Sequence, residues 1–297
     1  MRVAVVGPGA IGGMVGALLA RSGHDVCFVA RPASVDTLNH RGMTVESAMF
    51  GRFTVAVRAT ERLTGPVDVC VLAVKTPDLP AALDAVPRHA LGGGLALPLL
   101  NGWEHLEQVG RHFGAHTVIG GAIRVEATRS DATTVEHLSP FVRLTMGLHP
   151  GSAAVAAALE GAGITTEEGG TGLAAVWEKL TFLSPFALAT ARWGAGIGHV
   201  RHRHRADLEA LVTESAAVGA TFGATSTPAG LLRFIDALPP GMTSSLRRDL
   251  EARRPHELDA IGGGVVRAGQ AAGIAVETHA RLIAEIHRQD TGHAGVR

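Results

Sequence analysis

The sequence predicts an α/β domain with a Rossmann-type parallel sheet, followed by an all-α domain. Over roughly the first 125 residues, short apolar runs alternate with helical stretches, as in βαβ units. The first apolar run leads directly into a glycine-rich turn and an amphipathic helix, which is typical of a dinucleotide-binding fold. From about residue 170 onward, apolar residues recur only at helical spacing. We therefore expect a nucleotide-binding domain over residues 1–168 and a helical domain over residues 169–297.

The strands of the first domain are predicted from apolar runs bounded by turn residues. They are expected at Arg2–Val6, Val26–Ala30, Val67–Val74, Leu95–Leu100, Thr117–Ile123 and Phe141–Met146. Helices are expected between them at Ala10–Arg21, Ser34–Asn39, Leu79–Ala85 and Glu104–Gly110. This alternation suits a parallel sheet, because parallel neighbours need long crossover connections.

The second domain begins with a helix that has Leu173, Val176, Trp177 and Leu180 on one face. Further helices are expected at Arg205–Gly219, Ala229–Ala237, Ser244–Arg253, Glu257–Ala272 and Glu277–Arg288. Thr243 is predicted to cap the N-terminus of one of them, and Gly273 to end another. The His- and Arg-rich run from His199 to Arg205 is interpreted as a solvated basic loop and helix start.

Composition bounds the class of partner and the compartment. The 27 basic residues are balanced by 27 acidic ones, so net charge favours neither a nucleic acid nor an anionic membrane as partner. Cys27 and Cys70 lie in apolar runs and are predicted to be core residues in a reducing compartment. Apolar runs fall short of the ~18 residues of a membrane span. The strand expected to begin at Arg2 leaves no room for a signal peptide. We therefore expect a cytoplasmic protein.

The glycine-rich turn is predicted to bind the pyrophosphate of a dinucleotide. It consists of Gly7, Pro8, Gly9, Ala10, Ile11 and Gly12, between the first strand and the first helix. Glycines there allow a tight turn and close approach of the backbone to the phosphates, which the helix N-terminus attracts. The alternative is a glycine-rich turn that binds no ligand. Arg31 directly follows the second expected strand with no acid next to it, which favours the 2′-phosphate of NADP over NAD.

Only two lysines occur beside 25 arginines, which singles out Lys75 and Lys179. Lys75 follows the third predicted strand and Asn101 follows the next, at the strand ends where open α/β sheets bind ligands. Asn101 also begins an Asn-Gly pair, which is a common turn. Lys179 lies in an apolar helix, where it either extends its ammonium to solvent or is partly desolvated and suited to proton donation.

These features together resemble the ketopantoate reductase (2-dehydropantoate 2-reductase) family over essentially the whole chain. The matching segments are Gly7–Gly12, Lys75, Asn101-Gly102, Trp177–Leu180, Thr243–Leu246 with Asp249, Glu257–Asp259 and Gly273–Val276. The resemblance implies NADPH-dependent reduction of a 2-oxo acid, in pantothenate biosynthesis where the acid is ketopantoate. It also implies a helical domain of the 6-phosphogluconate dehydrogenase C-terminal type.

The resemblance further implies roles for individual residues. Lys179 would be the general acid at the 2-oxo oxygen, and Glu257 would hold the lysine or the nascent hydroxyl. Ser245 would bind the substrate carboxylate, and Asn101 would contact substrate and nicotinamide. Lys75 would lie at the cofactor–substrate junction, and Arg31 would meet the 2′-phosphate.

One departure from the family concerns the helix of Lys179. Family members have asparagines four and eight residues after the lysine, whereas this chain has Leu183 and Ala187 there, with Ser184-Pro185 between them as a possible kink. Loss of two amides from a polar pocket leaves buried substrate oxygens unpaired, at about 1–3 kcal/mol each. We therefore expect a different or more apolar 2-oxo acid, or weak activity on ketopantoate.

Several alternatives stay open on sequence alone. A β-hydroxy acid dehydrogenase or an imine reductase would share the two-domain plan, and a non-catalytic NADP-binding sensor would keep only the cofactor site. A metal site at His199, His202 and His204 is disfavoured because the arginines between them repel cations. A serine nucleophile at Ser184 or Ser245 lacks a paired base. The expected partner is a small-molecule substrate, and a homodimer is one option for the assembly.

Overall fold

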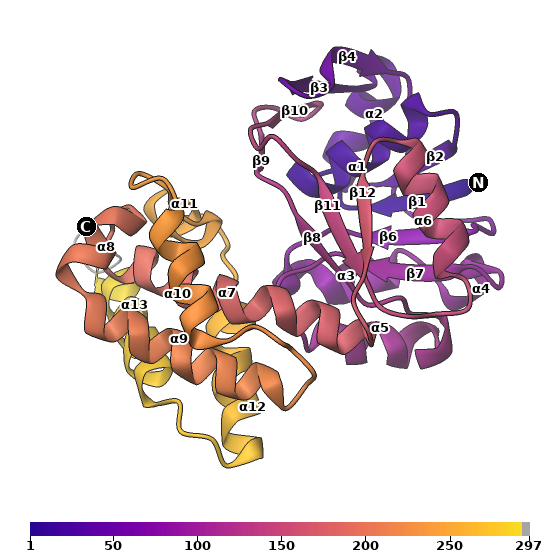
Figure 1. Cartoon of the computed structure of the whole chain (residues 1–297). Coiled ribbons are helices and arrows are strands. Elements are labelled where there is room, and N and C mark those ends of the chain that lie inside the picture. The colour runs from indigo at the N-terminus through magenta and orange to yellow at the C-terminus, as the bar shows by residue number, and fades with distance from the viewer. Residues whose placement is uncertain (293–297) are drawn as a thin grey trace. The chain divides into compact units, whose positions relative to one another are not determined.

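The computed structural model describes residues 1–292, which group into two units (Figure 1). The first unit contains Met1–Leu100 and His105–Ala175, and the second contains Asn101–Glu104 and the chain from Val176. The chain therefore passes between the units at three points, after Leu100, after Glu104 and after Ala175. The domain boundary expected after residue 168 stays a prediction.

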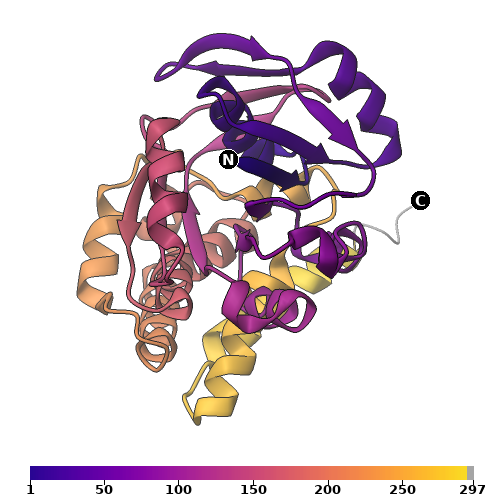
Figure 2. The same cartoon turned by 90° about the vertical axis from the view of Figure 1, so that its right-hand side faces the viewer.

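A five-stranded, fully parallel sheet organises the first unit, in the order β5-β2-β1-β6-β7. Its strands are β1 (Arg2–Val6), β2 (Asp25–Val29), β5 (Arg58–Thr60), β6 (Val69–Leu72) and β7 (Leu95–Pro98). In the central register, Val3 lies opposite Val26 on one side and Val69 on the other. Helices cover both faces of this sheet (Figures 1 and 2). They are α1 (Ala10–Arg21), α2 (Pro32–Arg41), α3 (Leu79–Asp84), α4 (Arg88–Leu91), α5 (His105–Phe113) and α6 (Ser152–Gly161), with short turns η1 (Thr76–Asp78) and η2 (Ala115–Thr117).

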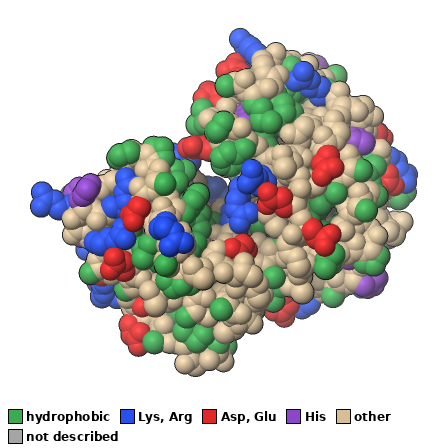
Figure 3. Space-filling model, viewed as in Figure 1, with side chains coloured by type: hydrophobic (Ala, Val, Ile, Leu, Met, Phe, Trp, Pro, Cys, Tyr) green, Lys and Arg blue, Asp and Glu red, His purple; other side chains and the backbone are tan. Residues whose placement is uncertain are grey.

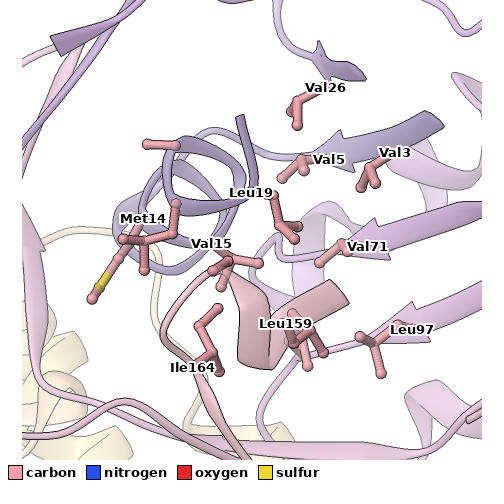
Figure 4. Packing of buried hydrophobic residues seen from close by; sticks show 14 of the residues in the cluster. Val3, Val5, Met14, Val15, Leu19, Val26, Val71, Leu97, Leu159 and Ile164 are labelled. Carbon is pink, nitrogen blue, oxygen red and sulfur yellow. The ribbon is translucent and has the colours of Figure 1, made fainter. Parts of the chain in front are cut away.

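Both faces of the sheet are apolar because its strands are buried on two sides. Along β1, Val3 and Val5 join the core that contains α1 and α6, while Ala4 and Val6 join the core that contains α3, α4 and α5. Figure 4 shows the first of these cores around α1. Gly16 allows α1 to approach the sheet closely, since a Cβ there would lie 2.4 Å from the Phe28 ring.

Two further sheets were not predicted as separate units of structure. One has the order β4-β3-β10-β9, with β3 (Met43–Ser47), β4 (Gly51–Val55), β9 (Ala127–Arg129) and β10 (Thr134–His137). The other has the order β12-β11-β8, with β8 (Gly121–Arg124), β11 (Arg143–Met146) and β12 (Thr165–Glu168). The prediction of a strand at Thr117–Ile123 is wrong at its start, because Thr117 lies in η2 and β8 begins at Gly121. Strands β8 and β11 pair antiparallel, outside the parallel sheet.

The second unit is helical, which confirms the predicted fold class. Its helices are α7 (Gly172–Arg192, beginning in the first unit), α8 (Ile197–Arg203), α9 (Arg205–Ala220), α10 (Pro228–Ala237), α11 (Ser245–Glu251), α12 (Gly264–Ala272) and α13 (Glu277–Gly292), with a π turn η3 (Asp259–Gly263) before α12. Helix α7 continues through Pro185. Its residues from Phe186 to Thr190 are all buried, so this part of α7 is covered on all sides, as in a central helix.

Two local predictions for this unit were wrong, and one predicted helix has a different first turn. Ser244, not Thr243, caps α11, since its Oγ accepts a hydrogen bond from the Arg247 amide at 3.2 Å. The segment expected as a basic loop forms helix α8. The helix expected from Glu257 begins with the π turn η3. The end of α12 is confirmed at Gly273, which has a left-handed φ of 67°.

Cys27 and Cys70 are free, buried thiols, as predicted. Burial raises the pKa of the Cys70 thiol to about 12, so it stays protonated in the core. On the face drawn in Figure 3, acidic and basic side chains are interspersed. Within residues 1–292, no helix combines the length and the hydropathy that crossing a bilayer requires.

Candidate active site

The glycine-rich turn has the geometry that a dinucleotide site requires. Gly7 has a left-handed φ of +89° and donates its amide to the Val29 carbonyl at 3.0 Å. A Cβ at Gly12 would lie 2.1 Å from the Gly7 carbonyl oxygen, so a side chain there would open the turn. At Gly9 a Cβ would meet nothing within 4 Å, and this open space lies at the start of α1. The turn therefore fits a pyrophosphate, because the first amides of a helix have no intrahelical partner.

The other residues of the turn hold it against the unit. The Pro8 side chain is buried, and its carbonyl accepts a hydrogen bond from Arg129 Nη1 at 3.4 Å. Ala10 is the first residue of α1, and Ile11 packs against the apolar core of the sheet. The predicted nucleotide loop at residues 7–12 is thus a tight turn, and it has open space at Gly9 where a ligand can approach the backbone closely.

Arg31 has an acidic partner that its sequence neighbourhood did not reveal. Its Nη2 lies 2.7 Å from Asp78 Oδ1, and the Arg31 side chain remains 78% exposed. Asp78 ends η1 after β6, so the fold brings it to Arg31 from 47 residues away. Most of the five guanidinium donors of Arg31 remain for another anion. Lys75 lies just before η1, three residues beyond the end of β6, and is half-buried.

A hydrogen-bonded chain of three side chains forms in the second unit. Lys179 Nζ, on α7, donates to Asn101 Oδ1 at 2.8 Å. Asn101 Nδ2 donates to Glu257 Oε2, also at 2.8 Å. The three residues come from widely separated positions and are all partly exposed. The fold thus brings together the predicted acid, its predicted carboxylate partner and the predicted substrate contact.

The residue before Lys179 anchors this part of α7. The Glu178 carboxylate accepts hydrogen bonds from the amides of Thr225 and Ser226, at 2.7 and 3.3 Å, and from both hydroxyls. Burial alone would raise the pKa of Glu178, but the hydrogen bonds from Ser226 and Thr225 outweigh it and lower that pKa. Sequence reasoning missed this contact because a Glu beside a Lys on a helix is an ordinary surface pattern.

The residues predicted to meet substrate differ in exposure. Ser245 is exposed at the first position of α11. Leu183 is half-buried, one turn after Lys179, whereas Ala187 has no exposed surface. Near Leu183, three phenylalanines form an aromatic group: Phe182 stacks on Phe186 with ring centroids 5.3 Å apart and meets the exposed Phe234 edge-on at 5.1 Å. This apolar surface was not predicted from the sequence.

The arrangement can supply a proton to an anionic oxygen. A lysine ammonium carries three donors, and the Asn101 carbonyl occupies one of them here. The Glu257 carboxylate, reached through the Asn101 amide, stabilises the positive charge of the lysine. Among the described residues, no group of three or more His, Cys, Asp and Glu side chains is placed to hold a metal ion.

Comparisons with known proteins show the family to which the chain belongs. The family profile "Ketopantoate reductase PanE/ApbA" matches residues 3–151, and the profile of the family's C-terminal domain matches residues 173–290. A 2-dehydropantoate 2-reductase of Caulobacter vibrioides is 29% identical over 95% of this chain and 97% of that protein.

Solved structures extend the comparison. A PanE/ApbA family ketopantoate reductase from Ralstonia eutropha JMP134 has a TM-score of 0.89 at 26% identity and covers 99% of this chain and 100% of its own. A D-mandelate dehydrogenase with NADH and anilino(oxo)acetate has a TM-score of 0.86, covers 98% of this chain and 99% of its own, and at 18% identity shows a shared fold. The chain therefore belongs to the ketopantoate reductase PanE/ApbA family and is an NAD(P)-dependent oxidoreductase of the ketopantoate reductase type.

Proposed function

We propose that this enzyme uses NADPH to reduce a 2-oxo acid with an apolar side chain to the corresponding 2-hydroxy acid, with Lys179 as the general acid. The observation that carries the proposal is the hydrogen-bonded chain from Lys179 through Asn101 to Glu257. The family resemblance implied a Lys179–Glu257 pair and, separately, a substrate contact at Asn101, and these roles support the proposal.

The chemistry assigns each of these residues a task. When bound at the glycine-rich turn, a reduced nicotinamide supplies the hydride. The carbonyl π electrons then move to the 2-oxo oxygen, and Lys179 stabilises this developing alkoxide and transfers a proton to it. The Asn101 side-chain oxygen orients the Lys179 ammonium by accepting its hydrogen bond. Glu257 holds Asn101 in place by accepting a hydrogen bond from the Asn101 side-chain nitrogen. The lysine regains its proton from solvent in the next cycle.

The preference for NADPH is supported by Arg31. Its guanidinium is largely exposed beside the strand end where the 2′-substituent of the cofactor is read. Asp78 complicates the choice, because a carboxylate at this place could also accept a hydrogen bond from the ribose 2′-hydroxyl of NADH. We assign Arg31 to the 2′-phosphate and Asp78 to the orientation of Arg31.

The substrate class is supported by the surface that follows Lys179. Half-buried Leu183 offers no amide to a polar substrate, and Phe182 and Phe234 add apolar surface within the same unit. A polar side chain on the substrate would lose hydration there without gaining a partner. Ketopantoate, which carries a hydroxyl group, is therefore expected to be a weaker substrate than a bulky hydrocarbon 2-oxo acid. A cytoplasmic location and a homodimer remain predictions.

The test is NADPH and NADH oxidation by the purified protein with four acids: ketopantoate, pyruvate, 4-methyl-2-oxopentanoate and phenylglyoxylate. We expect turnover with NADPH, highest with the two bulky acids. In Lys179→Ala, turnover should fall by ~10²–10⁴-fold while NADPH binding is retained. Unchanged turnover in that variant would remove Lys179 from the mechanism. Binding of NADPH without turnover of any acid would instead favour an imine reductase or a cofactor sensor.

A further inference from the structure

The strip Asn101–Glu104 is attached along its length to the segment that runs from Glu257 into α12. Asn101 donates to Glu257 at 2.8 Å, and Trp103 Nε1 donates to the Gly264 carbonyl at 3.0 Å. Glu104 accepts two hydrogen bonds from Arg267, from Nε and Nη2, each at 2.7 Å. The strip therefore has a specific contact at its first, third and fourth residues.

Gly102 completes the attachment by bringing the two backbones together. It has a left-handed φ of +81°, and a Cβ there would lie 2.6 Å from the Ala260 carbonyl oxygen. Any side chain would push the strip away from the π turn η3. The Trp103 ring fills the space beside it, with ring centroids 5.9 Å from Trp177 and 5.5 Å from Phe222.

Arg267 ties the end of the strip to the π turn. Its Nη1 and Nη2 donate to Asp259 Oδ1 and Oδ2 at 2.8 and 3.1 Å, while Nε and Nη2 bind Glu104. One guanidinium thus holds a carboxylate from each side of the contact. Hydrogen bonds to Glu104 and Asp259 raise the pKa of Arg267 further, so its charge is permanent. A π turn inserts an extra residue into a helix and often marks a functional site.

We propose that Arg267 is a positioning residue, which clamps Glu104 to the π turn and so keeps the Asn101 amide between Lys179 and Glu257. The inference rests on the proposed function, since it concerns the placement of that proton donor. Asn101 has bonds of 2.8 Å on both sides, and a shift of about 1 Å would break either one. Misplacement on this scale lowers rates by up to ~10²-fold.

The first measurement compares Arg267→Ala with Arg205→Ala. Arg205 is a matched control in the same unit, because it also lies between two carboxylates, Glu209 and Asp236, with a similar exposure of 36% against 45%. In Arg267→Ala, kcat should fall by ~10–100-fold while the KM for the cofactor stays within ~2-fold. Arg267→Lys should recover part of the loss, because an ammonium can pair with one carboxylate but lacks the planar fork. Arg205→Ala should keep its kcat.

A second readout follows the strip without using activity. The indole N–H signal of Trp103 is the one that disappears in Trp103→Phe. Its rate of exchange with solvent should rise in Arg267→Ala and should stay the same in Arg205→Ala. Full kcat in Arg267→Ala of an active enzyme overturns the positioning role. Equal losses of kcat in both alanine variants overturn it as well, because general destabilisation then suffices. If the wild-type protein reduces no 2-oxo acid, the proposed function is wrong, and the Trp103 exchange rate becomes the test of the clamp. An exchange rate that is unchanged in Arg267→Ala would overturn the clamping of Glu104 by Arg267.

Discussion

The cofactor preference of the enzyme centres on the ion pair of Arg31 and Asp78. Removing the guanidinium in Arg31→Ala should weaken NADPH binding by ~10–100-fold, the range of a hydrogen bond to a charged group, and NADH binding by far less. Asp78→Asn should tighten NADPH binding, because the amide oxygen can still orient Arg31 as a hydrogen-bond acceptor while the competing negative charge is removed. Fluorescence titration of both cofactors measures these constants. An equal loss for NADPH and NADH in Arg31→Ala would sink the phosphate assignment.

Substrate preference should respond to Leu183 more cleanly than to Ala187. Leu183→Asn restores an amide at a half-buried position and should raise kcat/KM for ketopantoate relative to 4-methyl-2-oxopentanoate. Ala187 has no exposed surface, so Ala187→Asn buries an amide and should destabilise the protein by about 1–3 kcal/mol. Kinetics with both acids, alone and in the double variant, tests this. No change of preference in Leu183→Asn means that another residue selects the substrate.

At the scale of single elements, the N-terminus of α11 offers a test of capping. Ser244 Oγ caps the helix and lies 2.8 Å from Thr190 Oγ1, whereas the buried Thr243 hydroxyl has no hydrogen-bond partner among residues 1–292. Ser244→Ala should therefore cost about 1–2 kcal/mol of stability. Thr243→Val should cost less than about 0.5 kcal/mol, because it removes an unsatisfied group of similar shape.

Chemical denaturation of the two α11 variants measures the difference. Equal destabilisation would show that Thr243 also supports the helix. The case shows why sequence reasoning placed the cap one residue too early: both residues are good caps, and only the backbone path decides which hydroxyl reaches the amide of Arg247.

Elements differed in how well the sequence predicted them. Strands β1, β2 and β6 and helix α1 are buried, apolar and separated by clear turns, so local pattern located them. Strand β12 is short and largely exposed, and its polar residues give no alternation to detect. In the π turn η3, Gly262 lies so close to Ile283 and Leu188 that a Cβ there would be 2.9 and 3.0 Å from their side chains, and local spacing does not express such a tertiary contact.

At the scale of the whole molecule, the stability of the helical unit should depend on acid through Glu214. This carboxylate on α9 accepts hydrogen bonds from the Thr278 and His279 amides at the start of α13 and from the buried His279 ring. Burial alone would raise the pKa of Glu214, but these hydrogen bonds lower it from 4.5 to about 2. The folded state therefore prefers the ionised form, and this stabilisation is present above about pH 4.5 and lost as the pH falls toward 2.

The expected size of the Glu214 contribution at pH 7 is about 3 kcal/mol. Glu214→Gln should lose much of it at neutral pH and should show a flatter stability curve between about pH 5 and pH 2. Glu209→Gln, an exposed carboxylate on the same helix, should follow the wild type. Urea unfolding across this range tests the prediction, which fails if Glu214→Gln and the wild type lose stability in parallel.

The candidate site was predictable in its parts and not in its connections. Lysine rarity and family resemblance singled out Lys179, Asn101 and Glu257, each from its own segment of sequence. Their hydrogen bonds form because segments that are distant in the sequence meet in the folded chain, and no local sequence pattern records such a meeting. The same reason hid Asp78 from Arg31, since 47 residues separate them.

The strip Asn101–Glu104 has a consequence for how this enzyme can be recombined with its relatives. A chimera joined at residue 176 would exchange Lys179, Glu257 and Arg267 together, yet it would leave the strip behind with the other parent. Such a hybrid should fold poorly around its proton donor even if each parent is fully active. Exchanging Asn101–Glu104 along with the C-terminal segment should restore folding around the proton donor. The part of the chain that must be transferred together is therefore encoded in two separate stretches of the gene.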